Sequence, residues 1–342
     1  MPGIGVITNP RSRINKRDPS HMRRLGYLLG SRGAAEATRS LDDLYRVAEE
    51  FKRVEIDVLG INGGDGTIHH TLTAFIRTYG DQPLPLIALL RGGTMNTIAN
   101  SLGIKGNPPK LLFELADRYH NHDAFDVFEH PILSIGDAYG YIFGSGLLYN
   151  FLEAYYATGR PSPVMAARLL AKACLSAMIG GRFARRVTRR FHARVIVDGD
   201  AWAREDFVTV TAATVWQLGF GFKPFYRVGE RPDAFPVLGI HPPSPLAIAT
   251  ELPRVRMGRP IRRDKVIDTL AREVRFEAEQ IEYIVDGDLY TAKGSLRVGL
   301  GPKLRMVRLT GQAQDALPVS PSARALPPVA KVGREAKDAP PA

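Results

Sequence analysis

The stretch that decides the fold is Ile61-Asn62-Gly63-Gly64-Asp65-Gly66-Thr67-Ile68. The hydrophobic run 54–61 predicts a buried strand that ends in this stretch, and a helical pattern begins at Thr67. Glycines at such a junction leave no side chain between backbone N–H groups and an incoming anion, and the helix N-terminus adds N–H donors and partial positive charge. The stretch therefore predicts a phosphate-binding turn. The plainer alternative is a tight strand-to-helix connection that binds nothing.

A second glycine turn follows the next predicted strand, residues 85–90. It reads Arg91-Gly92-Gly93-Thr94-Met95-Asn96, with Thr94 or Asn96 as the expected N-cap of a helix and Arg91 as an extra cation. Ligands of open parallel sheets bind at the carboxyl ends of the strands. Two glycine turns at adjacent strand ends are therefore expected to face each other across one crevice.

The N-terminal third of the chain has the alternating pattern of a parallel α/β sheet. Strands are predicted at 4–8 and 34–38, with helical spacing between them over 21–31. A further helix is predicted from Ser40 as N-cap to Phe51. This order of strands and helices predicts an α/β domain over residues 1–123.

The periodicity changes near residue 124. Short alternating segments separated by Gly and Pro predict an antiparallel β domain, a β-sandwich, over 124–294, interrupted by a helix over 163–179. Two strands within 295–310 would close the fold and are compatible with a return to the first domain. Residues 311–342 are rich in Pro and Ala, lack aromatic residues and predict a disordered tail.

Composition limits the kind of protein. The 342 residues suit two domains, and Cys174, the single cysteine, excludes an intramolecular disulfide or a cluster of thiolate ligands. We find no signal-peptide pattern, and the most apolar run, 164–179, is short and interrupted by Arg168 and Lys172. The sequence therefore predicts a cytoplasmic protein.

The net charge of +11, from 46 Lys and Arg against 35 Asp and Glu, favours polyanionic partners. Two arginine-rich stretches, 181–194 and 254–265, mix cations with apolar residues near the apolar helix at 163–179. This mixture favours peripheral docking on an anionic lipid surface. A polynucleotide groove is not expected because no nucleic-acid motif accompanies the charge. An ordinary solvated face stays open.

The first glycine turn, residues 62–67, resembles the nucleotide loop of diacylglycerol kinase-type lipid kinases. Sphingosine and ceramide kinases, NAD kinases and phosphofructokinases have related loops. The second turn resembles the family's Gly-Thr-x-Asn-Asp element, with Thr97 in place of the last Asp. The change from an α/β to a β domain also matches two-domain lipid kinases and fits phosphofructokinases poorly. The resemblance covers about residues 3–310.

This resemblance implies that the protein binds ATP and Mg²⁺. The implied nucleotide-binding residues are Asn9, Arg11, Thr38, Gly63, Gly64, Asp65, Gly66, Thr67, Gly93, Thr94 and Asn96. The resemblance further implies a Mg²⁺ site formed by Glu230, Asp233 and the main-chain carbonyl of Phe235, where hard oxygen ligands have the family's spacing. A charged turn is the alternative for these three residues.

The catalytic residues implied by the resemblance lie mainly in Asp286-Gly287-Asp288, which resembles the family's Asp-Gly-Glu. Asp288 would be the base for the lipid hydroxyl, with Asp286 beside it and Asp65 near the phosphates. The alternative is an ordinary hairpin turn, because Asp-Gly is a common hairpin signal and the same tripeptide occurs at 198–200.

The implied activity is ATP-dependent phosphorylation of the free hydroxyl of diacylglycerol or a related lipid. A ceramide or sphingoid-base kinase is an alternative that His69 favours, and an NAD kinase would need an Asn-Glu element that the sequence lacks. A catalytically inactive lipid- or nucleotide-binding protein is another, motivated by four departures from the family pattern: Thr97, Ala234, Asp288 and His70, the last in place of a glutamate. A homodimer stays open.

Overall fold

The computed structural model describes residues 3–10, 12, 29, 33–159, 162–241 and 244–309. Three of the sequence predictions fall outside these residues: the nucleotide contact of Arg11, most of the helix at 21–31 and the tail after residue 310.

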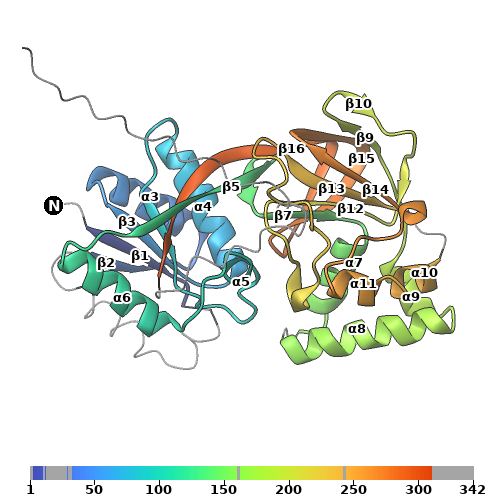
Figure 1. The fold of residues 1–342 in the computed structure, drawn as a ribbon, viewed down its shortest axis with the longest axis horizontal. Helices are drawn as coiled ribbons and strands as arrows, with labels where there is room; N and C mark the ends of the chain where they lie inside the picture. The colour runs from blue at the N-terminus through green and yellow to red at the C-terminus, as the bar shows by residue number, and fades with distance from the viewer. Residues whose placement is uncertain are drawn as a thin grey trace, which may run out of the picture.

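The N-terminal half is a parallel sheet with helices on both faces (Figure 1). Its strands, in spatial order, are β2 (Gly33–Ala37), β1 (Ile4–Thr8), β3 (Val58–Asn62) and β4 (Leu86–Leu89). Its helices are α3 (Leu41–Arg53), α4 (Asp65–Tyr79), α5 (Thr97–Ser101) and α6 (Pro108–His120). The Ser40 side chain accepts a hydrogen bond from the Asp43 N–H and caps α3, as predicted.

The strand and the helix on either side of the first glycine turn begin at other residues than the sequence predicts. Strand β3 begins at Val58 and not at Val54, because α3 continues to Arg53 and Glu55 then turns the chain with a φ of 54°. Helix α4 begins at Asp65, two residues before the predicted Thr67, so the carboxylate and the third glycine of the turn belong to its first turn.

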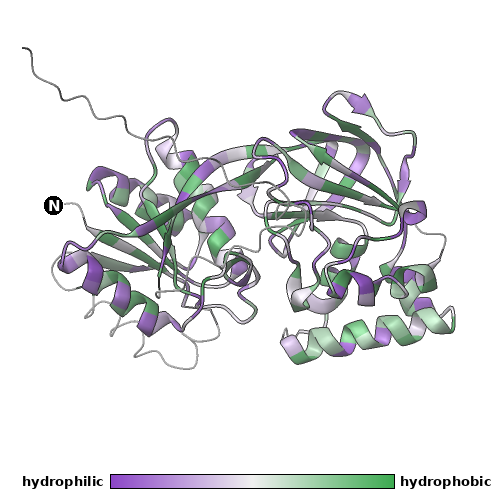
Figure 2. Cartoon of the chain, in the orientation of Figure 1, coloured by the Kyte–Doolittle hydropathy of each residue, from purple (hydrophilic) through white to green (hydrophobic). Residues whose placement is uncertain are grey.

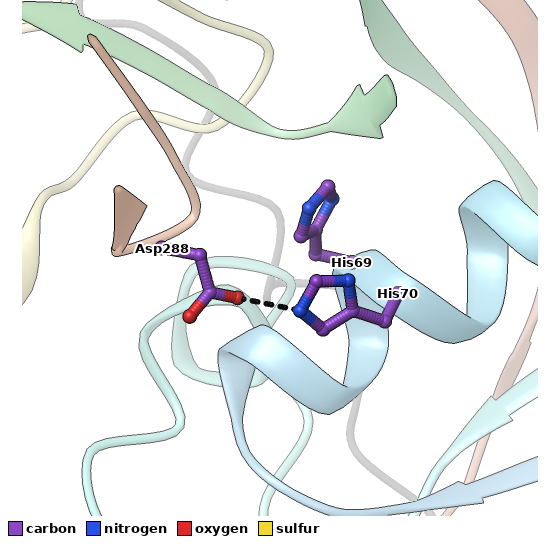
Figure 3. Close-up of side chains that lie close together, drawn as sticks. All are labelled: His69, His70 and Asp288. Carbon is purple, nitrogen blue, oxygen red and sulfur yellow. Dashed lines mark ion pairs between the residues drawn. The ribbon is translucent and has the colours of Figure 1, made fainter. Parts of the chain in front are cut away.

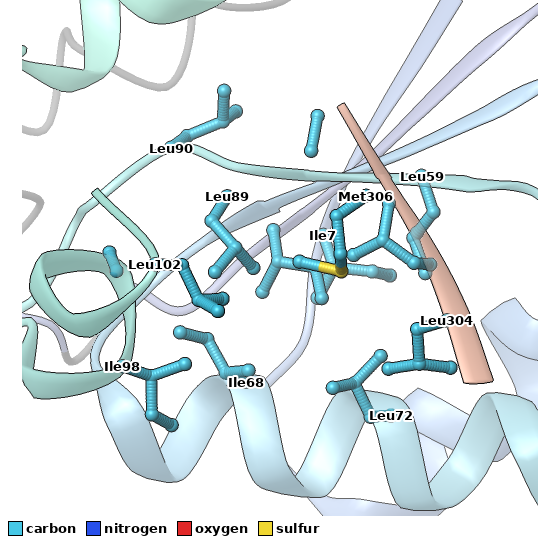
Figure 4. Packing of buried hydrophobic residues seen from close by; sticks show 14 of the residues in the cluster. Ile7, Leu59, Ile68, Leu72, Leu89, Leu90, Ile98, Leu102, Leu304 and Met306 are labelled. Carbon is cyan, nitrogen blue, oxygen red and sulfur yellow. The ribbon is translucent and has the colours of Figure 1, made fainter. Parts of the chain in front are cut away.

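The first core lies between this sheet and α4 (Figure 4). Ile68 and Leu72 on the inner side of α4 pack against buried residues of β3 and β4, and against Leu304 and Met306 of the last strand. The apolar residues of β1 and β3 are fully buried, as parallel strands covered on both faces require. This packing fixes the first turn of α4 at the carboxyl edge of the sheet.

The C-terminal half is an antiparallel sheet with helices along one side, so the predicted class of fold is confirmed (Figure 1). Its strands are β5 (Asp126–Ile135), β6 (Ala138–Gly140), β7 (Ile142–Ser145), β9 (Arg194–Val197), β10 (Asp200–Ala201), β12 (Thr209–Ala213), β13 (Phe235–Ile240), β14 (Val266–Ala271), β15 (Glu273–Val285) and β16 (Asp288–Arg308). Two short strands, β8 (Phe191–His192) and β11 (Asp206–Phe207), form a separate antiparallel pair. Apolar residues of these strands form a second core that includes Phe143 and Phe276, and Figure 2 shows much of the strands in green, the colour of hydrophobic residues.

The described residues of this half include the α-helices α7 (Leu147–Tyr156), α8 (Pro163–Met178), α9 (Arg182–Val187), α10 (Pro245–Ala249) and α11 (Leu252–Arg256). The sequence prediction contained only α8. Among the described residues, none of the helices combines the length and apolar character needed to cross a bilayer.

Two long strands, β5 and β16, connect the halves. They pair with each other, and the end of β16 runs parallel to β4, with Met306 opposite Ile87. One continuous sheet therefore runs from β14 to β2, and the start of β16 is held beside the carboxyl edge of the N-terminal strands. The domain limits 1–123 and 124–294 stay predictions.

Candidate active site

The two glycine turns pack directly against each other. A β-carbon at Gly93 would overlap the Cα of Gly64, and one at Gly92 would overlap the side-chain oxygen of Asn62. Only glycine allows this approach of one backbone to the other. The turns after β3 and β4 therefore form one surface, where the sequence suggested two sides of a crevice.

The Asp65 carboxylate holds the two turns together. Its two oxygens accept hydrogen bonds from the backbone N–H groups of Thr97, at 3.0 Å, and Ile98, at 3.1 Å, so Asp65 caps α5 from the other turn. Burial raises the pKa of the Asp65 carboxyl, and these two N–H donors oppose the shift. The structure thus places the carboxylate on the backbone of α5, where the sequence prediction had it beside the phosphates as a catalytic group.

The cap expected at Thr94 or Asn96 is absent among the described contacts. Asn96 has a φ of 48° and clamps its own turn, accepting a hydrogen bond from the Gly93 N–H at 3.0 Å and donating to the Gly93 carbonyl at 3.1 Å. Thr94 is exposed in the cleft between the two halves of the molecule. Arg91, expected as a phosphate cation, instead donates to the Asn100 side chain at 2.8 Å.

The end of β1 meets the first glycine turn. The Asn9 side-chain amide donates to Thr67 Oγ1 at 3.0 Å, and a β-carbon at Gly63 would overlap the Thr67 side chain. Thr38 follows β2, and its N–H donates to the Thr8 carbonyl at 3.1 Å. Asn9, Thr38 and Thr67 all line the same cleft, so the described nucleotide-binding candidates come from one edge of the sheet.

Asp288 reaches this edge from the C-terminal half. Its Oδ2 lies 3.1 Å from His70 Nε2, and a β-carbon at Gly66 would lie 2.8 Å from the same oxygen (Figure 3). The side chains of His70 and Asp288 are about one-third exposed. The carboxylate thus lies against the first turn of α4, next to the glycine turn.

Asp286 occupies a different position from the catalytic one expected. Its buried carboxylate accepts hydrogen bonds from the N–H groups of Tyr141 at 3.0 Å and Ile142 at 2.8 Å. Burial raises the pKa of Asp286 well above its ordinary value, and the two donors oppose this. Asp286 therefore joins the turn to the neighbouring backbone at the start of β7.

The second Asp-Gly-Asp of the chain has the same local structure. The φ angles are 50° and 101° at Asp286 and Gly287, and 51° and 99° at Asp198 and Gly199. The Asp198 carboxylate likewise accepts from two neighbouring N–H groups, those of Arg272 and Glu273, both at 2.9 Å. The first aspartate of each tripeptide thus stabilises a hairpin. The two turns differ in where the second aspartate lies: Asp288 lies in the cleft, whereas Asp200 is exposed outside it.

His69 and His70 point in different directions, as adjacent positions on a helix must. His69 is fully buried, with Nδ1 2.7 Å from the Tyr139 carbonyl and Nε2 2.7 Å from the Tyr290 hydroxyl. Its ring nitrogens are therefore occupied, and His70 is the histidine that faces the cleft. Our site prediction omitted His70. The sequence feature that could have identified His70 is the histidine itself, which replaces the family's glutamate at this position.

Burial lowers the pKa of His69 to about 4, so protonation of the unfolded chain should destabilise the fold in acid. The contribution is complete above the ordinary pKa of 6.5 and declines as the pH falls from there to about 4. Between pH 6.5 and pH 5 we expect a loss of about 2 kcal/mol of unfolding free energy from this residue.

Urea unfolding of wild type and His69→Gln at pH 7 and pH 5 measures this contribution. The comparison with the variant is needed because the raised pKa values of Asp65 and Asp286 act in the opposite direction. An equal pH dependence in the two proteins would contradict the burial of a neutral His69.

The cleft continues into an apolar cavity beneath the C-terminal sheet, and the two together have a volume of about 1390 Å³. Its polar mouth is formed by the glycine turns, His70 and Asp288. The interior is lined mainly by apolar side chains, among them Leu148, Phe151, Leu152, Leu170, Phe222 and Ile248. The lining of the cavity also contains a buried ion pair, in which Lys265 Nζ lies 3.0 Å from Glu251 Oε1. Lys265 precedes β14, four strands from β15 and Asp286, a separation of about 19 Å across a sheet.

The residues predicted as a Mg²⁺ site have other partners. Glu230 is paired with Arg227 at 2.8 Å, and Asp233 with Arg231 at 2.9 Å and with Arg272. Hydrogen bonds from Arg231 and Arg272 lower the pKa of Asp233 to about 2. Arginines therefore occupy the place of the predicted cation.

Phe235, the third predicted ligand, is buried at the start of β13, where it pairs with Ala271. None of the three predicted ligands lines the cleft. A Mg²⁺ site at these three residues stays a prediction, and in the structure both carboxylates are paired with arginines.

Gly66→Ala tests the contact between the halves. The added β-carbon would meet Asp288 Oδ2, whose side chain can move, while alanine suits the first turn of a helix. We expect an unchanged unfolding midpoint and a loss of activity of about 10-fold or more, because displacement of a reacting group by about 1 Å is costly. Gly80→Ala, at the far end of α4, would be an unsuitable control because its φ is 57°. Thr78→Ala on the same helix is the matched variant.

Comparison with known proteins defines the class first. Residues 3–128 match the family model of the diacylglycerol kinase catalytic domain. Three crystal structures of proteins from Bacillus anthracis str. Sterne, described as a diacylglycerol kinase or putative diacylglycerol kinases, share the fold with TM-scores of 0.61, 0.66 and 0.65. Their sequence identities are 14%, 16% and 15%, and the superpositions cover 90% of this chain and 96%, 96% and 97% of theirs.

Among individual proteins, this chain is similar to the probable lipid kinase YegS of Escherichia coli O127:H6 and of Shigella flexneri. The identity is 39% over 62 residues in each case. These alignments cover 18% of this chain and 20% of the relatives, so the match spans about a fifth of the length of either curated protein. The resemblance seen in the sequence is confirmed: the region 3–128 belongs to the diacylglycerol kinase catalytic domain family.

Proposed function

We propose that this protein is an ATP-dependent lipid kinase that phosphorylates the free hydroxyl of diacylglycerol or a related lipid. The position of Asp288 is the observation that carries the proposal. This carboxylate from the C-terminal half lies against Gly66 of the phosphate-binding turn, at the point where a long apolar cavity reaches that turn. Phosphate donor and apolar acceptor would therefore meet at one carboxylate.

The residues at the cleft suit a triphosphate. Gly64, Gly66 and Gly93 line the cleft without side chains, the Asp65 carboxylate accepts hydrogen bonds from α5, and the first turn of α4 contributes N–H donors and the positive end of its dipole. The exposed hydroxyl of Thr94 and the threonines at the other strand ends add hydrogen-bonding groups. ATP is therefore the donor that we assign to this surface.

Mg²⁺ would be held at the same place. Asp65 and Asp286 already accept backbone hydrogen bonds, so of the carboxylates described at the mouth, Asp288 is the one left to face a ligand. Mg²⁺ retains water and usually takes few protein ligands beside phosphate oxygens, so it would be held here mainly by the triphosphate and by water, which leaves the Asp288 carboxylate able to accept a proton. When bound, the ion neutralises the charge that develops on the triphosphate during transfer.

The acceptor hydroxyl would react beside Asp288. Its oxygen forms a bond to the γ-phosphorus, the bond from that phosphorus to the bridging oxygen breaks, and ADP leaves. The proton of the hydroxyl passes to the Asp288 carboxylate, which His70 Nε2 contacts at 3.1 Å. The protein otherwise contributes position and electrostatic stabilisation, which are the main requirements of phosphoryl transfer.

The apolar cavity favours a lipid over a dinucleotide as acceptor. Its walls carry Leu, Phe and Ile side chains over most of its length, whereas NAD would require polar partners along both nucleotides. Ceramide and sphingoid bases share the apolar character of diacylglycerol, and they remain alternative acceptors. We propose an anionic membrane surface as the source of the acceptor and peripheral association in the cytoplasm. A homodimer stays a prediction.

Transfer of label from [γ-³²P]ATP tests the function. The full chain would be incubated with Mg²⁺ and, separately, diacylglycerol, ceramide, sphingosine or NAD. We expect label in a lipid, and its loss in Asp288→Asn but not in Asp200→Asn. Label in NAD alone would contradict the lipid assignment. Nucleotide binding without transfer to any acceptor would identify a binding protein.

His70→Gln should slow transfer without weakening ATP binding, since the glutamine removes proton exchange with Asp288 and keeps a similar volume. We expect a decrease of kcat of about 10-fold to 100-fold, at the lower end of general acid–base contributions. The matched control is His120→Gln, an exposed histidine at the end of α6. An unchanged kcat in His70→Gln would exclude a part for this residue in the reaction.

A further inference from the structure

Helix α8 exposes an apolar stripe along its outer side. Val164, Leu175, Met178 and the following Ile179 are 61%, 65%, 68% and 83% exposed. Spacings of three and four residues through Arg168 and Ala171 join them into one line on the helix surface. Figure 2 shows α8 mostly green at the edge of the molecule. Scattered apolar residues are ordinary on a protein surface, but an aligned row of this kind marks an interaction site.

The inner side of the same helix forms a wall of the apolar cavity. Ala166 and Leu169 are buried, and Ala166 and Leu170 line the cavity. The most extensive contacts of α8 are with the helices α7, α9 and α10, and α8 forms the lower edge of the C-terminal half in Figure 1. One helix therefore separates the proposed acceptor cavity from the outside.

The charged residues in the segment that contains the stripe have one sign. Residues 162–194 contain no Asp or Glu and eight cations: Arg168, Lys172, Arg182, Arg185, Arg186, Arg189, Arg190 and Arg194. Carboxylates from other segments pair with Arg186, Arg189 and Arg194. Within the described part of the chain, no carboxylate lies within ion-pair distance of Arg168 or Arg182. Lys172 lies over the Phe183 ring at 4.7 Å, so its charge stays near the stripe.

We propose that α8 is a membrane-docking helix that lies in the plane of an anionic bilayer. Val164, Leu175, Met178 and Ile179 enter the interface, and Arg168, Lys172 and Arg182 contact anionic headgroups. An apolar row flanked by cations, with no carboxylate in the segment, is the pattern of interfacial helices. The inference rests on the proposed function in one respect, that a lipid leaving the bilayer enters the cavity past this helix.

Binding to vesicles tests the proposal independently of catalysis. The full chain would be sedimented with vesicles of phosphatidylcholine alone, or of phosphatidylcholine and phosphatidylglycerol at about 3:1. We expect binding to the anionic vesicles that falls about 10-fold or more in Leu175→Gln/Ile179→Gln, neither of which lines the cavity. Arg168→Gln/Lys172→Gln should bind more weakly and with less dependence on salt.

Phe113→Gln is the matched control. Phe113 is an exposed apolar residue on α6 of the other half, 58% exposed, and its replacement should leave vesicle binding unchanged. Circular dichroism and the unfolding midpoint would show that each variant folds. Equal vesicle binding by wild type and Leu175→Gln/Ile179→Gln would overturn the proposal.

Two further measurements distinguish membrane docking from a dimer interface and from an effect on catalysis. Light scattering gives the mass in solution, and a dimer that Leu175→Gln/Ile179→Gln dissociates, without vesicle binding by wild type, would assign the stripe to a second copy of this chain and overturn the proposal. Transfer to a water-soluble short-chain diacylglycerol should be equal in wild type and this variant. Vesicle binding through α8 without any transfer would leave the docking helix in place and contradict only the proposed kinase activity.

Discussion

Asp288→Asn is expected to lower the rate of phosphoryl transfer by about 10²-fold to 10⁴-fold, the range of general acid–base contributions. The amide keeps the size of the side chain but cannot accept the hydroxyl proton. Asp288 is partly exposed, and no backbone N–H donor is described for its carboxylate, so the variant should fold with an unchanged unfolding midpoint. The measurements are kcat for lipid phosphorylation and, separately, the affinity for ATP.

The chain supplies its own control for this prediction. Asp200 ends the other Asp-Gly-Asp turn, which has the same φ angles and lies outside the cleft. Asp200→Asn should therefore have wild-type activity. Asp286→Asn removes a buried acceptor of two N–H groups and should lower stability as well as activity. Asp288→Asn with a kcat within about threefold of wild type would remove Asp288 from the mechanism.

Asp65→Ala is expected to have the second large effect, on both stability and nucleotide binding. The substitution leaves the N–H groups of Thr97 and Ile98, both in buried residues, without their acceptor. We expect a loss of about 2–4 kcal/mol of unfolding free energy, because unpaired buried donors cost about 1–3 kcal/mol each. The second glycine turn would also lose its attachment to the first, and ATP affinity should fall.

Asp65→Asn distinguishes two roles of Asp65: accepting hydrogen bonds from the backbone of α5, and binding a metal ion. Asparagine keeps one oxygen acceptor, so its stability should lie between those of wild type and Asp65→Ala. Excess Mg²⁺ should restore neither variant, because the lost partners are backbone N–H groups. Full stability of Asp65→Ala, or recovery of its activity at high Mg²⁺, would contradict the anchoring.

Local signals in the sequence were sufficient to predict the class of fold. The glycine turn at 63–66, the Ser40 cap and the change of periodicity near residue 124 each depend on neighbouring residues, and the α/β and antiparallel halves are confirmed. The sequence prediction missed the short helices α7, α9, α10 and α11. Their formation depends on packing beneath the sheet more than on a long periodic pattern.

The arrangement of the candidate site depends on contacts between distant segments. His70 and Asp288 meet because β16 begins at the carboxyl edge of the parallel strands and later pairs beside β4. The sequence pattern contains neither that crossing nor the capping of α5 by Asp65. In the same way Arg272, in the bend between β14 and β15, reaches Asp233, so the local sequence does not show that this carboxylate is paired with a distant arginine.

Hydrogen–deuterium exchange with a non-hydrolysable ATP analogue and Mg²⁺ tests the central claim most directly, since that claim is that both glycine turns hold one triphosphate beside Asp288. We expect the nucleotide to slow exchange in 63–70 and 92–98 together, and in the segment around Asp288, while the turn at 198–200 is unchanged. Protection of one glycine turn alone, or of neither, would contradict the claim.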